Sequence, residues 1–170
     1  MRKFKTLLSL SIVAGLSLMA CMASAQTINT AGTASIDVQP ALTVTLVASP
    51  DWGKVTRPSS GTARYTLNYS TGATTLTSGT GHAFSNGANG SYTVGGTASS
   101  PVSFSVSIGA FSGSGITVVA SHINGTSGSG TGSLDGGGAL TLLVGGVLDV
   151  ASTATVAVQT ATVTVSVDYQ

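Results

Sequence analysis

Charged residues are scarce in this chain of 170 residues: Asp, Glu, Lys and Arg together make up 6%, and glutamate is absent. Beyond residue 25 the basic residues are Lys54, Arg57 and Arg64, and the acidic residues are five aspartates. This charge pattern does not favour binding to nucleic acid or anionic lipid. Helices draw on Ala, Leu, Glu, Lys, Gln and Arg with 3.6-residue periodicity, which this Gly-, Ser- and Thr-rich sequence lacks. The sequence therefore predicts an all-β protein.

Cysteine is nearly absent as well, since Cys21 is the single example. It lies in a segment with the layout of a secretory signal: a basic start at residues 2–5, an apolar run over 7–20, and a small-x-small site at 23–25. We expect cleavage between Ala25 and Gln26, leaving a cysteine-free mature chain without disulfides or thiolate metal sites. This predicts a signal peptide over residues 1–25, a single domain over 26–170, and export to the periplasm, cell surface or medium.

An alternative for the same segment stays open. Residues 18–21 (LMAC) resemble the lipobox at which bacterial lipoproteins are cut and acylated on cysteine. The protein would be held at a membrane only if Cys21 is lipidated in this way.

Alternation of apolar and polar residues with a period of two indicates half-buried strands. It is clearest at the C-terminus, where Val163, Val165, Val167 and Tyr169 alternate with polar residues. Further strands are expected over residues 34–38, 42–48, 63–69, 92–94, 102–108, 116–121, 139–144, 147–150 and 154–158. Glycine-rich clusters, among them 125–132 and 145–146, are interpreted as turns. About 8–10 short strands separated by turns favour an antiparallel β-sandwich.

The apolar parity changes just before the last strand. Ala154, Val156 and Val158 occupy even positions, whereas the apolar residues from Ala161 onward occupy odd ones. A bulge or tight turn is therefore expected at residues 159–160.

Few residues offer chemistry. Acid–base catalysis needs converging carboxylates or histidines, yet the chain holds five aspartates and only His82 and His122. The Gly-x-Ser-x-Gly turn of a hydrolase nucleophile does not occur in the sequence. We therefore predict a non-enzymatic protein with no catalytic, cofactor or metal site. Trp52 beside Asp51 is either a sugar-stacking anchor of an adhesin or an aromatic of the core.

Four stretches, in order, resemble one family. They are LTVT at 42–45 followed by DWGKV at 51–55; YTVGG at 92–96 followed by VSFSV at 102–106; GALTLLVGGVLDV at 138–150; and VTVSVDY at 163–169. Together they are similar to secreted bacterial β-sandwich domains of unknown function, akin to spore coat protein U and chaperone-usher pilin subunits. The Gly-x-Tyr step that members carry before the last strand is replaced here by residues 159–161 (QTA).

The resemblance implies an Ig-like or pilin-like sandwich and a structural subunit of a pilus, fimbria or surface coat. It implies self-association by strand addition. It also implies a periplasmic chaperone that pairs with the last strand, which carries Val163, Val165, Val167 and Tyr169. Residues 33–38, with Ile36 and Val38 alternating, would be the donor strand or, alternatively, an ordinary first strand. A monomeric secreted or periplasmic binding module or adhesin is the second hypothesis.

Overall fold

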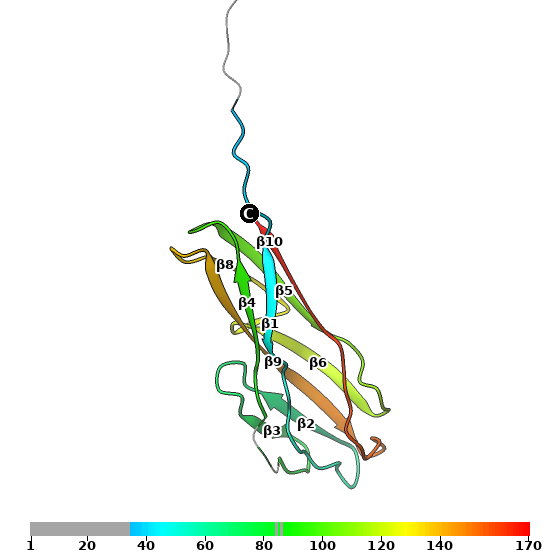
Figure 1. Ribbon diagram of the computed structural model, residues 1–170. Helices are drawn as coiled ribbons and strands as arrows, with labels where there is room; N and C mark the ends of the chain where they lie inside the picture. Colours follow the sequence, from blue (N-terminus) through cyan, green and yellow to red (C-terminus); the bar gives the residue numbers. More distant parts are fainter. Residues whose placement is uncertain (1–34, 84, 86) are drawn as a thin grey trace, which may run out of the picture. The chain divides into compact units, whose positions relative to one another are not determined.

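The computed structural model describes residues 35–83, 85 and 87–170, so the predicted signal segment, Cys21, Ala25 and Gln26 lie outside the described residues. The chain divides into two units, Met1–Asp37 and Val38–Gln170, and the second unit holds every strand described (Figure 1). The strands are β1 (Thr43–Ala48), β2 (Thr62–Leu67), β3 (Thr74–Ser78), β4 (Gly90–Gly95), β5 (Pro101–Ile108), β6 (Ile116–Ile123), β7 (Thr126–Ser127), β8 (Ser129–Ser133), β9 (Ala139–Ala151) and β10 (Val163–Tyr169). No helix occurs among the described residues, which confirms the all-β prediction.

The larger sheet is organised around β9, its longest strand. All pairings are antiparallel, in the order β1-β4-β9-β2-β3, with β6 also on β9 and β7 on β6. Val144 pairs with Gly90 of β4 on one edge and with Ile123 of β6 on the other. From Gly146 onward β2 takes the place of β4 on the first edge. One strand thus holds three neighbours in register.

The glycine pair in the middle of β9 does not form the turn predicted from sequence. Residues 139–144 and 147–150, expected as two strands, are parts of one strand of 13 residues. A Cβ atom on Gly145 would meet the carbonyl oxygen of Leu67 and the backbone nitrogen of Tyr69, and one on Gly146 would meet the carbonyl oxygen of Ala120. These glycines therefore allow the backbones of neighbouring strands to approach closely, which is a known role of glycine inside a strand.

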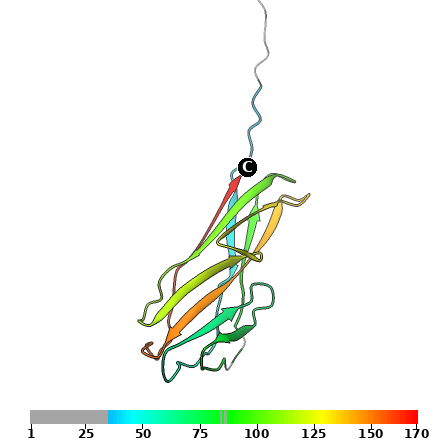
Figure 2. The same ribbon diagram turned by 180° about the vertical axis from the view of Figure 1, so that it is seen from behind.

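The smaller sheet has the order β10-β5-β8 and faces the larger one across the core (Figure 2). One apolar cluster joins the inner faces of β4, β5 and β9 around Val94, Phe104 and Val144. A second, around Tyr65, Leu67 and Leu148, packs β2 and β9 against the flanking loops. Two open antiparallel sheets of ten described strands confirm the predicted β-sandwich.

Three further expectations about strands were wrong. Residues 35–38 form no strand, and neither do residues 154–158, where the chain passes from β9 in one sheet to β10 in the other. The glycine-rich stretch 125–132, interpreted as a turn, includes β7 and most of β8. Gly130 stands in β8 because its missing Cβ leaves room for the ring of Phe104.

Candidate functional site

Strand β10 lies at an edge of the smaller sheet. Its seven residues pair with β5 without a break, from Val163 opposite Ile108 to Tyr169 opposite Val102, and β5 is its only partner among the described strands. The predicted alternation is confirmed, because Val163, Val165, Val167 and Tyr169 are half-buried against the core while the residues between them are exposed. The second edge of β10 is therefore open to another strand.

Strand β1 is the neighbouring edge of the larger sheet and runs in the opposite direction. It pairs with β4 alone and lies near β10. The start of β1 is tied to the end of β10, since the Tyr169 hydroxyl donates to the carbonyl oxygen of Pro40 at 3.1 Å and accepts the backbone N–H of Thr97 at 2.7 Å. The two edges thus form one side of the sandwich.

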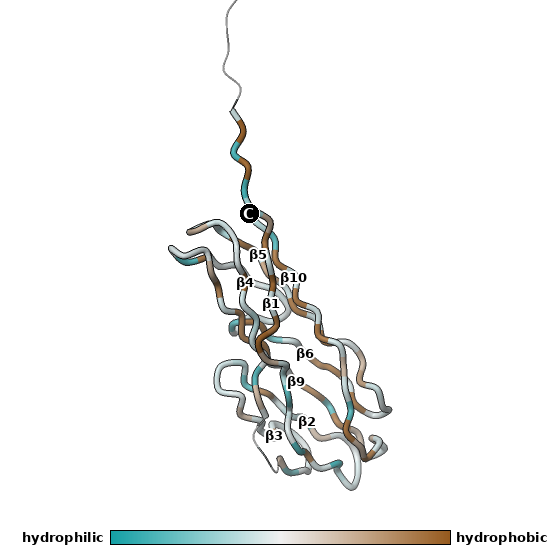
Figure 3. The backbone as a smooth tube through the Cα atoms, viewed as in Figure 1, coloured by the Kyte–Doolittle hydropathy of each residue, from teal (hydrophilic) through white to brown (hydrophobic). Residues whose placement is uncertain are grey.

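Apolar side chains line this side without being covered. Val44 and Leu46 are opposite the buried Val94 and Tyr92, so they point toward the core, yet they are 41% and 54% exposed. Across from them are the half-buried valines of β10, and Figure 3 shows apolar colour along both strands. We call this set the open side; it consists of Val44, Leu46, Val163, Val165 and Val167. Its two exposed members, Val44 and Leu46, lie beside three half-buried valines, and contiguous apolar surface of this kind is typical of interaction sites.

The segment predicted as a donor strand is also exposed. Ile36 and Val38 are 86% and 79% exposed, and residues 35–38 belong to no strand. Two large aliphatic side chains at alternate positions, outside any sheet, have the spacing that one face of an added strand needs.

The other residues that the sequence singled out lie elsewhere. Trp52 is buried and packs edge-to-face on Phe111, with ring centroids 6.1 Å apart, so it is an aromatic of the core and does not offer a face to a sugar. His82 is exposed in a loop, and His122 is half-buried in β6. Within residues 35–83, 85 and 87–170, no three His, Cys, Asp or Glu residues gather as they would around a metal ion.

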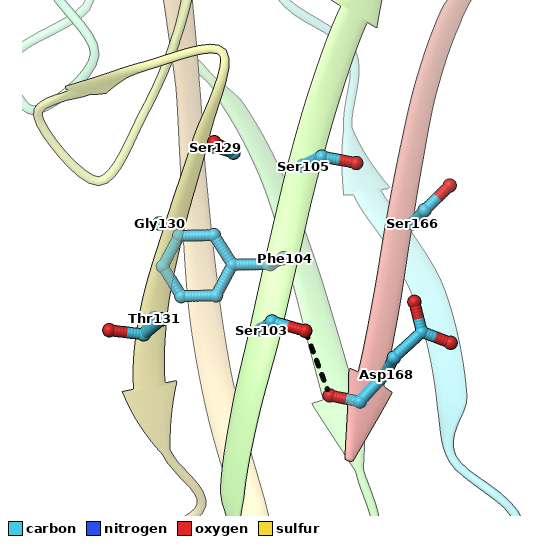
Figure 4. A pocket seen from close by; sticks show the side chains of 8 residues that line it. All are labelled: Ser103, Phe104, Ser105, Ser129, Gly130, Thr131, Ser166 and Asp168. Atoms are coloured by element: carbon cyan, nitrogen blue, oxygen red, sulfur yellow. Dashed lines mark hydrogen bonds between the residues drawn. The ribbon is translucent and has the colours of Figure 1, made fainter. Parts of the chain in front are cut away.

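A hollow of about 360 Å³ that sequence reasoning missed lies on the outer face of the smaller sheet (Figure 4). Its lining is Ser103, Phe104, Ser105, Ser129, Gly130, Thr131, Ser166 and Asp168. Ser103 Oγ donates to the backbone carbonyl oxygen of Asp168 at 3.5 Å. The only sequence signal was serine at every second position of β5, which any wet strand face shows. Hydroxyls and one carboxylate give this hollow hydrogen-bonding capacity.

Asp149 and Asp135 have lowered pKa values, and neither belongs to the open side or to the hollow. Asp149 on β9 receives two hydrogen bonds from the Arg64 guanidinium on β2, at 2.7 and 2.8 Å, which lower its pKa. Asp135 accepts the backbone N–H groups of Ala139 and Gly137, both at 2.8 Å, and these donors lower its pKa. In its ionised form Asp149 joins β9 to β2, and ionised Asp135 stabilises the turn over residues 135–139.

Within the part of the chain that the structure describes, no helix is long and apolar enough to cross a membrane. No protein-family model, no curated protein and no solved structure matches the chain.

Proposed function

We propose that this protein is an exported, non-enzymatic subunit of a pilus-like or coat-like surface assembly, and that its copies join by strand addition. Residues 31–38 of one copy would be the donor strand, and the free edge of β10 in another copy would be the acceptor. The observation that carries the proposal is the open side, an uncovered apolar strip beside an unpaired edge, in a protein whose own Ile36 and Val38 are exposed.

An antiparallel donor fits the apolar pattern of β10. With Val38 opposite Val163, Ile36 falls opposite Val165 and Ala34 opposite Val167, so the apolar residues of both strands face the core. Full burial of each valine or isoleucine contributes about 1.5–3 kcal/mol. The added backbone hydrogen bonds would satisfy the exposed edge as in donor-strand complementation.

The direction of the chain favours a donor from a second copy. Residue 40 is held beside Tyr169 at the C-terminal end of β10, so a copy's own residues 31–38 could only fold back parallel to β10. Parallel pairing is slightly less stable per residue than antiparallel pairing, and the reversal would have to occur at Gln39 and Pro40. Donation from one copy to the next is a heterologous contact, which generates filaments when it does not close into a ring.

Export and a periplasmic chaperone belong to the same proposal. Support for them comes from the signal-like residues 1–25 and from the resemblance to pilin subunits. A chaperone strand paired with β10 before assembly would protect the same edge that the donor later occupies.

Deletion of residues 31–38 tests the proposal. The intact chain, expressed with its own N-terminal segment and purified from the periplasm, should form oligomers in size-exclusion chromatography with light scattering. The deletion variant should be a folded monomer with the same β-rich circular dichroism spectrum.

A pair of substitutions provides the matched control. Ile36→Asp places a charge on the face of the donor strand that is turned toward the core, and should abolish assembly. Ser35→Asp places the same charge on the opposite face of that strand, and should preserve assembly. Assembly that survives both the deletion and Ile36→Asp would rule out strand addition.

The hollow on the outer face of the smaller sheet supports one alternative, a monomeric secreted or periplasmic binding module or adhesin. Hydroxyl groups beside Asp168 could hydrogen-bond a sugar. A monomer that binds a glycan, and loses that binding on Asp168→Ala, would favour this alternative.

A further inference from the structure

The segment that crosses from β9 to β10 exposes two valines at its tip. We call residues 152–162 the crossing loop; within it Val156 is 79% exposed and Val158 is 94% exposed. The tip is closed by the side-chain amide of Gln159, which donates to the carbonyl oxygen of Thr155 at 2.9 Å. This bond holds the two valines in solvent, and neither valine has a place in the core of its own copy.

Backbone hydrogen bonds attach the crossing loop to the loop between β5 and β6. The N–H of Thr155 donates to the carbonyl oxygen of Ser114 at 3.1 Å, and the N–H of Ser112 donates to that of Thr160 at 2.8 Å. The crossing loop is therefore an ordered projection, and it contains no charged residue whose desolvation would oppose an apolar contact.

The crossing loop leads directly into Val163, the first residue of β10. In the antiparallel pairing proposed above, Val38 of the donor copy lies opposite Val163. The donor chain therefore leaves the acceptor at the crossing loop and not at the end that carries Tyr169.

The link between donor strand and donor body is short. Pro40 is bound to the body of its own copy through the Tyr169 hydroxyl, and Ser100 Oγ lies 3.5 Å from Gln39 Oε1. Only Gln39 separates Val38 from Pro40, and two residue steps span at most about 7 Å. The donor's body must then sit against the end of the acceptor that carries the crossing loop.

We propose that Val156 and Val158 form a second contact between successive copies, against the end of the donor copy that carries Pro40 and Ala41. This inference rests on the proposed strand addition and adds a body-to-body interface to it. The contact buries two valines that are otherwise in water and limits the angle between neighbours, since a linker of one residue cannot swing freely once the bodies touch.

A disulfide trap tests the contact directly. Two versions of the intact protein, both carrying Cys21→Ser, are mixed: one has Val158→Cys and the other Ala41→Cys. After assembly and mild oxidation with diamide, a cross-linked dimer should form in the mixture and not in either version alone. In the control Ser129→Cys on β8 replaces Val158→Cys, and this mixture should give no cross-link.

A second measurement does not depend on thiol geometry. The double substitution Val156→Ser with Val158→Ser should raise the concentration for half-assembly by about tenfold or more, because two buried aliphatic contacts are lost. Val119→Ser, a matched change at an exposed valine of β6, should leave that concentration unchanged.

The outcomes separate the two proposals. If copies assemble through residues 31–38 but Val158→Cys gives no cross-link with Ala41→Cys and the double serine variant assembles normally, the second contact is overturned and strand addition stands. If the deletion of residues 31–38 does not affect assembly, or if no assembly forms, strand addition fails and the second contact fails with it.

Discussion

The hydroxyl group of Tyr169 joins three segments that are far apart in the sequence. It bonds Pro40 before β1 and Thr97 after β4, and it belongs to the next-to-last residue of the chain. The sequence indicated Tyr169 through the alternation of the last strand and through the resemblance of residues 163–169 to one family. Its hydrogen-bond partners depend on how two sheets meet, which local alternation does not encode.

Replacing this hydroxyl tests its role. Tyr169→Phe removes both hydrogen bonds and should lower the free energy of unfolding by about 1–3 kcal/mol, since a typical intramolecular hydrogen bond contributes about 0.5–1.5 kcal/mol. The backbone amides of Gln39, Ala41 and Leu42 should also exchange with deuterium faster. Urea unfolding and hydrogen exchange measure the two effects, with Tyr69→Phe as the control that removes the same atom away from this junction. Equal effects of the two substitutions would show that the junction has no special role.

Asp135 should make stability depend on pH. Backbone N–H groups of Ala139 and Gly137 favour its ionised form, so its pKa is lower in the folded than in the unfolded state. Its contribution is therefore fully present above the unfolded pKa of about 4 and is lost as the pH falls through the lower folded value.

Thermal unfolding of Asp135→Asn measures this dependence. The variant should melt below the wild type at pH 7, and the gap should narrow below about pH 4. A gap that is constant from pH 7 to pH 2.5 would mean that ionisation of Asp135 does not matter. Asp168→Asn, the same change at an exposed carboxylate of β10, is the control.

At the scale of the element, glycine was the residue from which secondary structure was hardest to predict. A Gly-Gly pair predicts a turn by its local conformational freedom, but Gly145 and Gly146 lie inside β9 because the backbones of neighbouring strands approach there. Such an approach is set by strands distant in sequence. Sequence reasoning therefore split one strand into two.

Gly145→Ala should lower the free energy of unfolding much more than a glycine-to-alanine substitution at a position with open space. The new Cβ would meet backbone atoms of Leu67 and Tyr69, which cannot rotate away. Overpacking of this kind costs about 1–3 kcal/mol. Gly136→Ala is the matched control, because a Cβ there has open space. Chemical denaturation of both variants decides the matter, and equal midpoints would contradict the role assigned to Gly145.

Alternation predicted β10 correctly and failed at residues 154–158 for a physical reason. Both segments alternate, but Val163 to Tyr169 have β5 as a partner, whereas Val156 and Val158 have none and are held in a turn by Gln159. A strand needs a neighbour as well as a pattern. The bulge or tight turn expected at residues 159–160 is not found there, because the chain turns at 152–153 and bends at 156–157, and residues 159–160 lie in the longer passage between the sheets.

At the scale of the whole molecule, composition was sufficient for the fold class. The scarcity of helix formers and the regular turn signals predicted a sandwich of short antiparallel strands, and two such sheets occur. The candidate site was only partly predictable: the sequence indicated Ile36, Val38 and the valines of β10. It did not indicate that β1 would leave Val44 and Leu46 uncovered beside them, because exposure at a sheet edge depends on which strand is missing there.

The central position of β9 also governs when the molecule can fold. Its partners β2, β4 and β6 all precede it in the chain. During synthesis they can form local pairs such as β2 with β3, but the strand that holds them in register emerges only at residues 139–151. We therefore expect that the larger sheet cannot close before β9 has been made, and that the earlier strands stay accessible to proteases and chaperones until then.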